Sequence, residues 1–239
     1  LNEDSLFALH LDTVSQPGHS PFGLFIVADG MGGQAAGEIA SQTAIKEMAR
    51  HVTRHIVAPL LDGGEIPDVA EALRAACQQA NKTIYDMSRR QNNDMGTTCV
   101  AAIVRDRSAV LANVGDSRAY LVDDGGLTQI TVDHSLVERL ITLGKITRDQ
   151  ARTHPDRNLI LRHLGEKAAV EIDVFTTALQ PRQWLVLCSD GLNSMIDDDV
   201  IYQAVVTAPT PEAACRALID RALAAGGDDN VSVIVLHVT

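Results

Sequence analysis

The chain has 239 residues, of which 46% are hydrophobic and only 3% aromatic, and its formal net charge is −11. A chain of this length can form one large domain, and its core must be built mainly from Val, Ile, Leu and Ala. The strongly acidic balance argues against nucleic acid and anionic membranes as main partners. The four cysteines form no CxxC pair, which is typical of a reduced compartment, so we expect a cytoplasmic protein.

The first strong signal along the chain is the apolar run at 22–28, which predicts a strand buried on both faces. Two amphipathic helices are predicted next, over 34–55 and 69–90, and the Pro- and Gly-rich stretch APLLDGGEIPD separates them. Two helices in succession after the first strand do not fit an alternating β-α-β arrangement. No apolar run reaches the roughly 18 residues that a membrane-spanning helix needs.

Short apolar or alternating runs follow, and because tight turns join them we expect one antiparallel meander. Its strands are predicted at 97–104, 108–114, 118–122 and 127–131. The remaining elements are a polar, partly helical segment at 133–166, a strand at 184–189, helices at 198–206 and 211–225, and a closing strand at 230–238. Thr147 is predicted to cap a short helix inside the polar segment.

Paired helices and antiparallel runs of strands predict an α+β fold in which helices cover the sheets. No linker is long enough to divide the chain, so we expect a single domain over residues 1–239. The segment 133–166 has few core residues and is expected to form a lid or subdomain on the sheet. Its histidines, and those beside it, are expected at the surface or at helix ends.

The stretch VADGMGG, residues 27–33, ends the first strand in a carboxylate followed by three glycines. Residues 30–35 match the dinucleotide fingerprint G-x-G-x-x-A, so a nucleotide-dependent oxidoreductase is one alternative. Two features oppose it: a second helix replaces the expected second strand, and the charge of Asp29 would repel a pyrophosphate. A P-loop is excluded because no Gly-Lys-Ser/Thr follows. One Asp-Gly pair by itself is ordinary turn chemistry.

Three other strand ends carry aspartates. Asp190 follows the run LVLCS, Asp228 and Asp229 precede NVSVIV, and Asp116 lies in a tight turn between two strands. If these tips converge, like charges a few ångströms apart cannot all stay ionised without cations. Oxygen ligands favour hard cations such as Mg²⁺ or Mn²⁺, and a pair of such ions activates water for the hydrolysis of phosphate esters. The pattern therefore predicts a metal site.

Six motifs, in this order, resemble those of the PPM, or type 2C, metal-dependent protein Ser/Thr phosphatases of the bacterial branch. They are NED at 2–4, DGMGG at 29–33, MGTT at 95–98, GDSR at 115–118, CSDGL at 188–192 and GGDDNVSV at 226–233. The resemblance implies a four-layer α-β-β-α sandwich of two antiparallel sheets flanked by paired helices, with 133–166 as a flap. It also implies hydrolysis of phosphoserine and phosphothreonine in proteins, opposing a cognate Ser/Thr kinase.

Carried over by position, the resemblance makes Asp29 the carboxylate that bridges two Mn²⁺ or Mg²⁺ ions. The backbone carbonyl of Gly30 would bind the first ion, and Asp190 and Asp229 would bind the second. Bacterial relatives hold a third, weaker ion, for which Asp116 would be a ligand together with Asp190.

The acidic first motif supplies two more site residues by the same resemblance. Glu3 would be a direct ligand, as in eukaryotic relatives, and Asp4 would act through a metal-bound water. The catalytic set is therefore Asp4, Asp29, Asp190 and Asp229. Asn230 is expected to brace its loop, and Thr97 and Thr98 to pack beneath the site.

Two positions depart from the family pattern. The family's phosphate-binding arginine belongs just upstream of Glu3 and so before Leu1, and the resemblance does not pass that role to Arg118. Met31 stands where eukaryotic relatives often carry a histidine, the proposed general acid. A non-catalytic relative that binds phosphoproteins is therefore the alternative function; the missing arginine supports it and the intact aspartates oppose it.

Overall fold

The computed structural model describes residues 2–15, 18–33 and 36–239. The strands are β1 (Asp4–Ser15), β2 (Gly18–Met31), β3 (Gly96–Thr97), β4 (Cys99–Arg105), β5 (Ser108–Val114), β6 (Arg118–Asp123), β7 (Gly126–Gln129), β8 (Asp173–Ala178), β9 (Trp184–Cys188) and β10 (Val233–His237). The helices are α1 (Ala36–Val52), the π-helical turn η1 (Thr53–Val57), α2 (Ala58–Leu61), α3 (Val69–Gln91), α4 (Leu136–Thr142), α5 (Arg148–Arg152), α6 (Asp190–Asn193), α7 (Asp198–Val206) and α8 (Pro211–Ala224).

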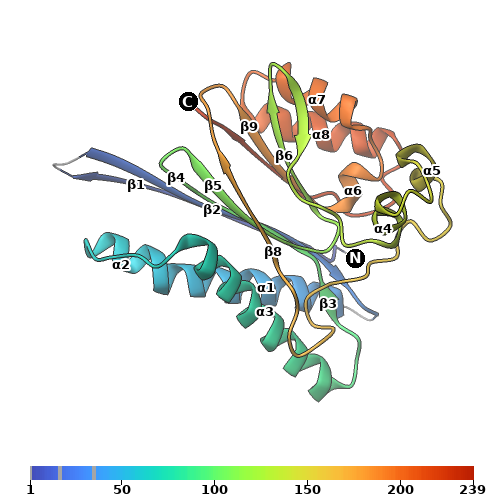
Figure 1. Ribbon diagram of the computed structural model, residues 1–239, viewed down its shortest axis with the longest axis horizontal. Helices are drawn as coiled ribbons and strands as arrows, with labels where there is room; N and C mark the ends of the chain where they lie inside the picture. Colours follow the sequence, from blue (N-terminus) through green and yellow to red (C-terminus); the bar gives the residue numbers. More distant parts are fainter. Residues whose placement is uncertain (1, 16–17, 34–35) are drawn as a thin grey trace.

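Two antiparallel sheets lie between two layers of helices (Figure 1). The first sheet has the strand order β1-β2-β4-β5-β8, with β3 paired to the end of β2, and the second has the order β10-β9-β6-β7. Helices α1 and α3 cover the first sheet, and α7 and α8 cover the second. The predicted α+β, four-layer sandwich is therefore confirmed.

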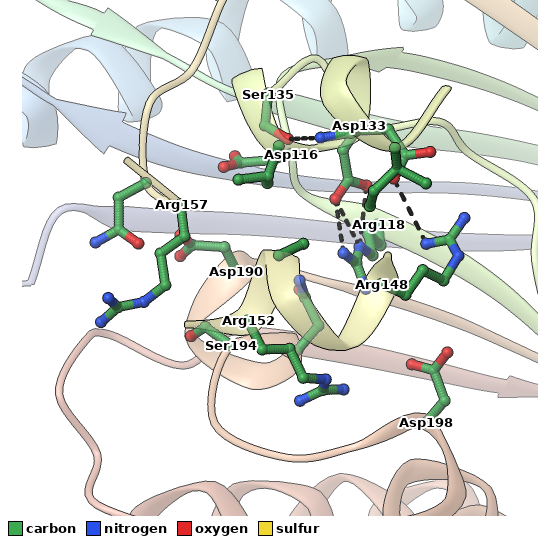
Figure 2. A pocket seen from close by; sticks show the side chains of 16 residues that line it. Asp116, Arg118, Asp133, Ser135, Arg148, Arg152, Arg157, Asp190, Ser194 and Asp198 are labelled. Atoms are coloured by element: carbon green, nitrogen blue, oxygen red, sulfur yellow. Dashed lines mark hydrogen bonds and ion pairs between the residues drawn. The ribbon is translucent and has the colours of Figure 1, made fainter. Parts of the chain in front are cut away.

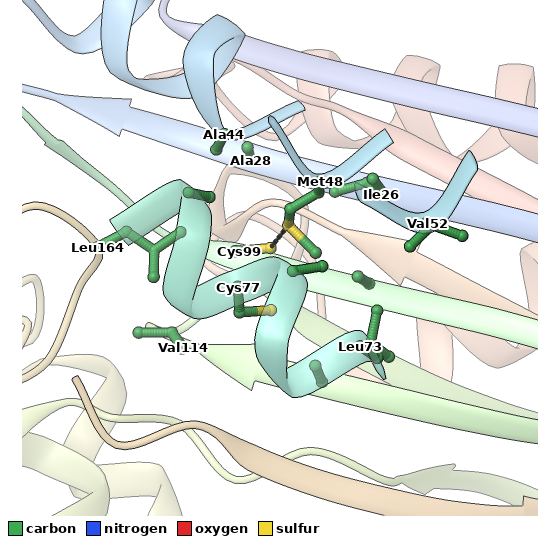
Figure 3. Packing of buried hydrophobic residues seen from close by; sticks show 14 of the residues in the cluster. Ile26, Ala28, Ala44, Met48, Val52, Leu73, Cys77, Cys99, Val114 and Leu164 are labelled. Atoms are coloured by element: carbon green, nitrogen blue, oxygen red, sulfur yellow. Dashed lines mark hydrogen bonds between the residues drawn. The ribbon is translucent and has the colours of Figure 1, made fainter. Parts of the chain in front are cut away.

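The apolar run at 22–28 is buried on both faces, as predicted. Leu24 and Ile26 pack toward α1 and α3, whereas Phe25 and Val27 pack toward the second sheet. The helix-side core is built mainly from aliphatic and sulfur side chains, including Met48, whose Sδ lies 3.3 Å from the Cys99 thiol (Figure 3). Alternation along one strand thus fills two separate cores.

The predicted single meander is wrong. β4 and β5 belong to the first sheet, but β6 and β7 belong to the second, and the chain crosses between the sheets at Gly115–Ser117. Gly115 has a φ of +112°, which glycine adopts without strain. Local alternation predicts strands but not the sheet that each one joins, so the crossing is visible only in the pairing.

Two edge strands were not predicted, and one helix is longer than expected. β1 and β8 form the edges of the first sheet, where half-exposed faces weaken the apolar pattern. Residues 34–35 lie outside the described chain, and from Ala36 the helix continues through η1 and α2 to Leu61. Pro59 is tolerated because it lies in the first turn of α2, directly after the wide π-helical turn.

The other helices agree closely with the sequence. α3 begins after Asp68, whose side chain accepts a hydrogen bond from the Glu71 amide, and α7 covers the predicted residues 198–206. In the segment 133–166, Thr147 forms the predicted cap, as a reciprocal capping box with Gln150. No helix in the described part of the chain is long and apolar enough to cross a membrane.

Candidate active site

Strand pairing brings the predicted aspartates to one end of the sandwich. Asp4 lies opposite Asp29 in the β1–β2 register. Asp29 is also close enough to feel the charges of Asp190 and Asp116, and Asp4 feels those of Asp190 and Asp229. We call these five side chains the aspartate cluster. The predicted site residues therefore converge although up to 225 positions separate them in the sequence.

Burial and mutual repulsion make the cluster reluctant to ionise. Burial, helped by the charges of Asp190 and Asp4, raises the pKa of Asp29 to about 10. Burial likewise raises the pKa of Asp116 to about 8 and that of Asp4 to about 6. The pKa of Asp190 is also raised by burial, and a hydrogen bond with Asp29 partly offsets the rise. The cluster therefore needs positive charge, whether from protons or from cations.

The chemistry of the donor set fits a hard cation. The Oδ1 atoms of Asp116 and Asp190 are buried and have no hydrogen-bond partner within the described chain. Buried acceptors are rarely left unpaired, and carboxylate oxygens are the ligands that Mg²⁺ and Mn²⁺ prefer. No three His, Cys, Asp or Glu side chains of the described residues already close around a common point. Metal binding would therefore require these carboxylates to move closer together around the ion.

Close backbone approach places Glu3 beside the carbonyl of Gly30. A Cβ atom on Gly37 would lie 2.9 Å from both the Glu3 carboxyl carbon and the Gly30 oxygen. The Glu3 carbonyl accepts hydrogen bonds from the Gly30 amide (3.2 Å) and the Ser41 hydroxyl (2.6 Å). The Glu3 amide donates to Asn230 Oδ1 (2.8 Å). Two predicted ligands thus meet where α1 begins, and Asn230 holds the backbone of Glu3 there.

The second sheet is tied to Asp4 through a serine that sequence reasoning missed. Ser189 donates from its hydroxyl to Asp4 Oδ2 (2.8 Å) and accepts a hydrogen bond from the Ser232 amide (3.0 Å). A Cβ atom on Gly191 would lie 2.1 Å from the Asn230 carbonyl oxygen, so the loops after β9 and before β10 touch. The motif CSDGL contains Ser189, but only the fold shows its partner.

Thr97 and Thr98 hold Asp29 from beneath, as expected. The Asp29 carbonyl accepts hydrogen bonds from the Thr97 hydroxyl and the Thr98 amide, each at 2.8 Å. The Asp29 amide donates to Thr98 Oγ1 (3.0 Å), and that hydroxyl also bonds to Ser117 Oγ (2.7 Å). These bonds connect the end of β2 to the crossing between the sheets.

Arg118 is held by an ion pair and by a hydrogen bond to a tyrosine. Its Nε and Nη2 donate to Asp133 at 2.7–3.0 Å, and its Nη1 donates to the Tyr120 hydroxyl at 3.0 Å. Both members of the ion pair are largely buried. Asp133 and Tyr120 therefore fix the position of the Arg118 guanidinium. Asp133 was missed because nothing in the local sequence links it to Arg118, 15 positions earlier.

A cavity of about 150 Å³ opens beside the cluster, bordered by Asp116, Asp190 and the segment 133–166 (Figure 2). That segment contributes Arg148, Arg152 and Arg157 to the wall. Arg152 pairs with Asp197 and Arg148 lies 3.5 Å from Glu138, whereas Arg157 forms no ion pair with the described residues. A larger cavity, of about 590 Å³, lies elsewhere in the fold and contains none of the cluster.

Comparison with known proteins gives one consistent family. The model of the protein phosphatase 2C family matches residues 2–223. The serine/threonine phosphatase stp of Listeria monocytogenes is 38% identical over 219 residues, covering 90% of this chain and 84% of that protein. The crystal structure of the serine/threonine phosphatase PstP/Ppp of Mycobacterium tuberculosis aligns over 98% of both chains, with a TM-score of 0.81 and 34% identity.

A further solved structure resembles both the fold and the expected chemistry. It is the catalytic domain of the serine/threonine protein phosphatase PstP in complex with two manganese ions, which is 33% identical with a TM-score of 0.77. The alignment covers 97% of this chain and 96% of that one. The strand pairing also argues against the dinucleotide alternative, because a dinucleotide-binding fold has a mostly parallel sheet. Within each of the two sheets, every pairing among the described strands is antiparallel. From its fold, its converging aspartates and these matches, the chain belongs to the protein phosphatase 2C family.

Proposed function

We propose that this protein hydrolyses phosphoserine and phosphothreonine in proteins at the aspartate cluster, with two Mn²⁺ or Mg²⁺ ions and a third, weaker one. The observation that carries the proposal is the convergence of five carboxylates, of which two present buried oxygens that have no hydrogen-bond partner among the described residues. A bound pair of such ions lowers the pKa of a water and neutralises phosphoryl oxygens.

The residues divide between the ions according to their places in the fold. Asp29 lies opposite Asp4 and interacts with the charges of Asp190 and Asp116, and it would bridge the two ions. The Gly30 carbonyl and Glu3 would hold the first ion, since both lie beside Gly37. Asp190 and Asp229 would hold the second.

The outer members of the cluster have supporting roles. Asp116 faces Asp190 and would share a third ion with it. Asp4, held by the Ser189 hydroxyl, would orient a water rather than bind an ion directly. The cavity beside Asp116 and Asp190 would receive the phosphoryl group, and the segment 133–166 would act as a flap over it.

A water nucleophile is also consistent with the state of the thiols. Burial raises the pKa of Cys188 to about 12, and burial also raises the pKa of Cys215. A buried thiol of raised pKa is a poor nucleophile. The substrate would therefore be attacked directly, without a covalent phosphoenzyme.

The wider setting of the activity is part of the same proposal. Residues 1–239 would act as one catalytic domain, and the phosphoprotein substrates would be supplied by a cognate Ser/Thr kinase. The formal net charge of the chain is −11, which disfavours polyanions as substrates and is compatible with a protein that carries a single phosphate group at the site.

Hydrolysis of a phosphothreonine peptide with Mn²⁺ and with EDTA tests the proposal. Turnover should require the metal, and Asp190→Asn should lower kcat/KM about 100-fold or more, because it removes one ligand charge from the site. Asp220→Asn, on the exposed face of α8, is the matched control and should retain activity.

Two results would contradict the proposal. Full activity of the Asp190→Asn variant would remove Asp190 from the metal site. Tight binding of the phosphopeptide with its phosphate retained, in the presence of Mn²⁺, would instead support the non-catalytic binding protein.

A further inference from the structure

His134 forms hydrogen bonds with the backbone of Gly115, the residue before Asp116, contrary to the expectation that His134 lies at the surface. It is 8% exposed. Its ring Nδ1 accepts a hydrogen bond from the Gly115 amide (3.0 Å), and its backbone amide donates to the Gly115 carbonyl (2.9 Å). Both polar groups of Gly115 are thus bonded to one residue.

The other ring nitrogen fixes the imidazole in place. Because Nδ1 accepts a hydrogen bond, the neutral ring carries its hydrogen on Nε2, which lies 3.2 Å from Asp173 Oδ2 on β8. Arg162 Nη1 donates to Asp173 Oδ1 (2.8 Å) and lies 3.0 Å from Nε2. Burial lowers the pKa of His134, which favours this neutral form. The ring orientation is therefore set from a strand outside the crossing.

Asp116 depends on such support because few of its own side-chain contacts hold it in the cluster. The residue is 7% exposed, and Oδ1 has no partner within the described chain. Asp190 and Asp133 repel the carboxylate, whereas Arg118 and the backbone at Asp116 stabilise its charge. The position of the carboxylate must therefore come from the backbone. Gly115 fixes that backbone. A Cβ atom there would lie 2.6 Å from the Thr98 Cβ, so Thr98 packs tightly against Gly115. His134 is hydrogen-bonded to both the amide and the carbonyl of Gly115.

We propose that His134 is a positioning residue that holds Asp116 in the aspartate cluster by clamping the Gly115 peptide between β5 and β6. This role rests on the proposed function in so far as Asp116 serves a metal. His134 also ties the crossing to the segment 133–166, because its carbonyl accepts a hydrogen bond from the Leu161 amide (2.7 Å). One residue thereby connects the crossing, β8 and the segment that borders the cavity.

Two variants separate the functions of the ring nitrogens. In His134→Asn, the Oδ1 atom replaces Nδ1 as an acceptor for the Gly115 amide. In His134→Gln, the longer amide reaches toward Asp173 but leaves the Gly115 amide without its acceptor. Loss of one buried hydrogen bond should speed hydrogen exchange of the Gly115 amide in metal-free His134→Gln by about tenfold, with His134→Asn close to the wild type.

Kinetics provides the second measurement. In His134→Gln, the Mn²⁺ concentration for half-maximal activity should rise about tenfold with little change in KM for a phosphopeptide, and His134→Asn should restore it. The same pair of substitutions at the exposed His55, in the π-helical turn of the helix that begins with α1, is the matched control and should change neither quantity.

A measurement on the wild type does not depend on the variants folding. Nuclear magnetic resonance should detect coupling across the hydrogen bond between the Gly115 amide nitrogen and His134 Nδ1. Absence of that coupling, or equal Gly115 exchange in the two variants, would overturn the clamp. If exchange differs as expected while no form hydrolyses the peptide, the clamp stands and the proposed function fails.

Discussion

Gly30 is the residue at which the end of β2 and the start of α1 come closest. A Cβ atom there would lie 2.1 Å from the Gly37 carbonyl oxygen and 2.6 Å from that of Glu3, both of which are backbone atoms. Neither neighbour can rotate away. The glycine is therefore required by contact rather than by a left-handed turn, and it sets the position of a predicted ligand carbonyl.

Gly30→Ala should lower the free energy of unfolding by about 1–3 kcal/mol, because the added methyl group forces the backbone apart. It should also weaken Mn²⁺ activation. Gly33→Ala in the same motif is the matched control, since a Cβ atom at Gly33 would meet nothing within 4 Å. Urea unfolding of both variants measures the difference, and equal stability would show that the contact at Gly30 relaxes freely.

At the scale of elements, the Arg118–Asp133 pair joins β6 to the start of the segment 133–166. The side chains are 18% and 6% exposed, and Gln129 also donates to Asp133 (2.9 Å). A buried ion pair loses most when one partner is removed, because the other charge stays desolvated. The pair therefore anchors the segment to the second sheet rather than to substrate.

Asp133→Asn should lower the free energy of unfolding by about 3–5 kcal/mol, since it leaves the Arg118 charge buried. Glu212→Gln removes one partner of an ion pair with Arg216 on α8, whose side chains are 74% and 76% exposed. That control should change stability by less than about 1 kcal/mol. Denaturant unfolding measures the free energy of unfolding of both variants. A similar loss of stability in the two would mean that the Arg118–Asp133 pair is effectively solvated.

The segment 133–166 also presents Arg157 to the cavity without an ion-pair partner among the described residues. Arg157→Ala should raise KM for a phosphopeptide about fivefold, the value of one exposed charged contact, and leave kcat on a small aryl phosphate unchanged. Arg216→Ala, on α8, is the control. A fall in kcat that is equal for both substrates would place Arg157 in the chemistry instead of in peptide binding.

For the whole molecule, the aspartate cluster makes stability depend on pH and metal together. The pKa values of Asp4, Asp116 and Asp29 in the folded protein are about 6, 8 and 10, above the usual 3.8. The folded protein therefore keeps protons that the unfolded chain releases once the pH exceeds about 4. With these groups, stability without metal is greatest below pH 4 and falls as the pH rises toward 10.

Added Mn²⁺ should therefore raise the Tm more at pH 8 than at pH 6, because cations take the place of protons that the cluster otherwise retains. The difference should be at least about 3 °C for a protein of this size. Asp29→Asn should reduce the difference, whereas the exposed Asp220→Asn should not. Thermal denaturation with and without Mn²⁺ measures the change in Tm. An equal change at both pH values would contradict the raised pKa values.

The sequence by itself determined the residue types of the site and most of the helices. Carboxylates at strand ends pointed to hard cations because that inference needs only residue chemistry, and six ordered motifs pointed to the family. The helix predicted at about 198–206 agrees with α7 because helical periodicity is local. The same locality explains why Thr147 was recognised as a cap.

Only the tertiary structure decided which sheet each strand joins and which groups support the aspartates. The crossing at Gly115, the edge strands β1 and β8, and the partners of Arg118 and His134 all depend on residues distant in sequence or on weak edge patterns. Periodicity reports which face of a segment is apolar, but not what that face meets. Pairing across a fold is chosen by packing and burial of the whole chain, and this is why the supporting contacts of the site emerged only from the structure.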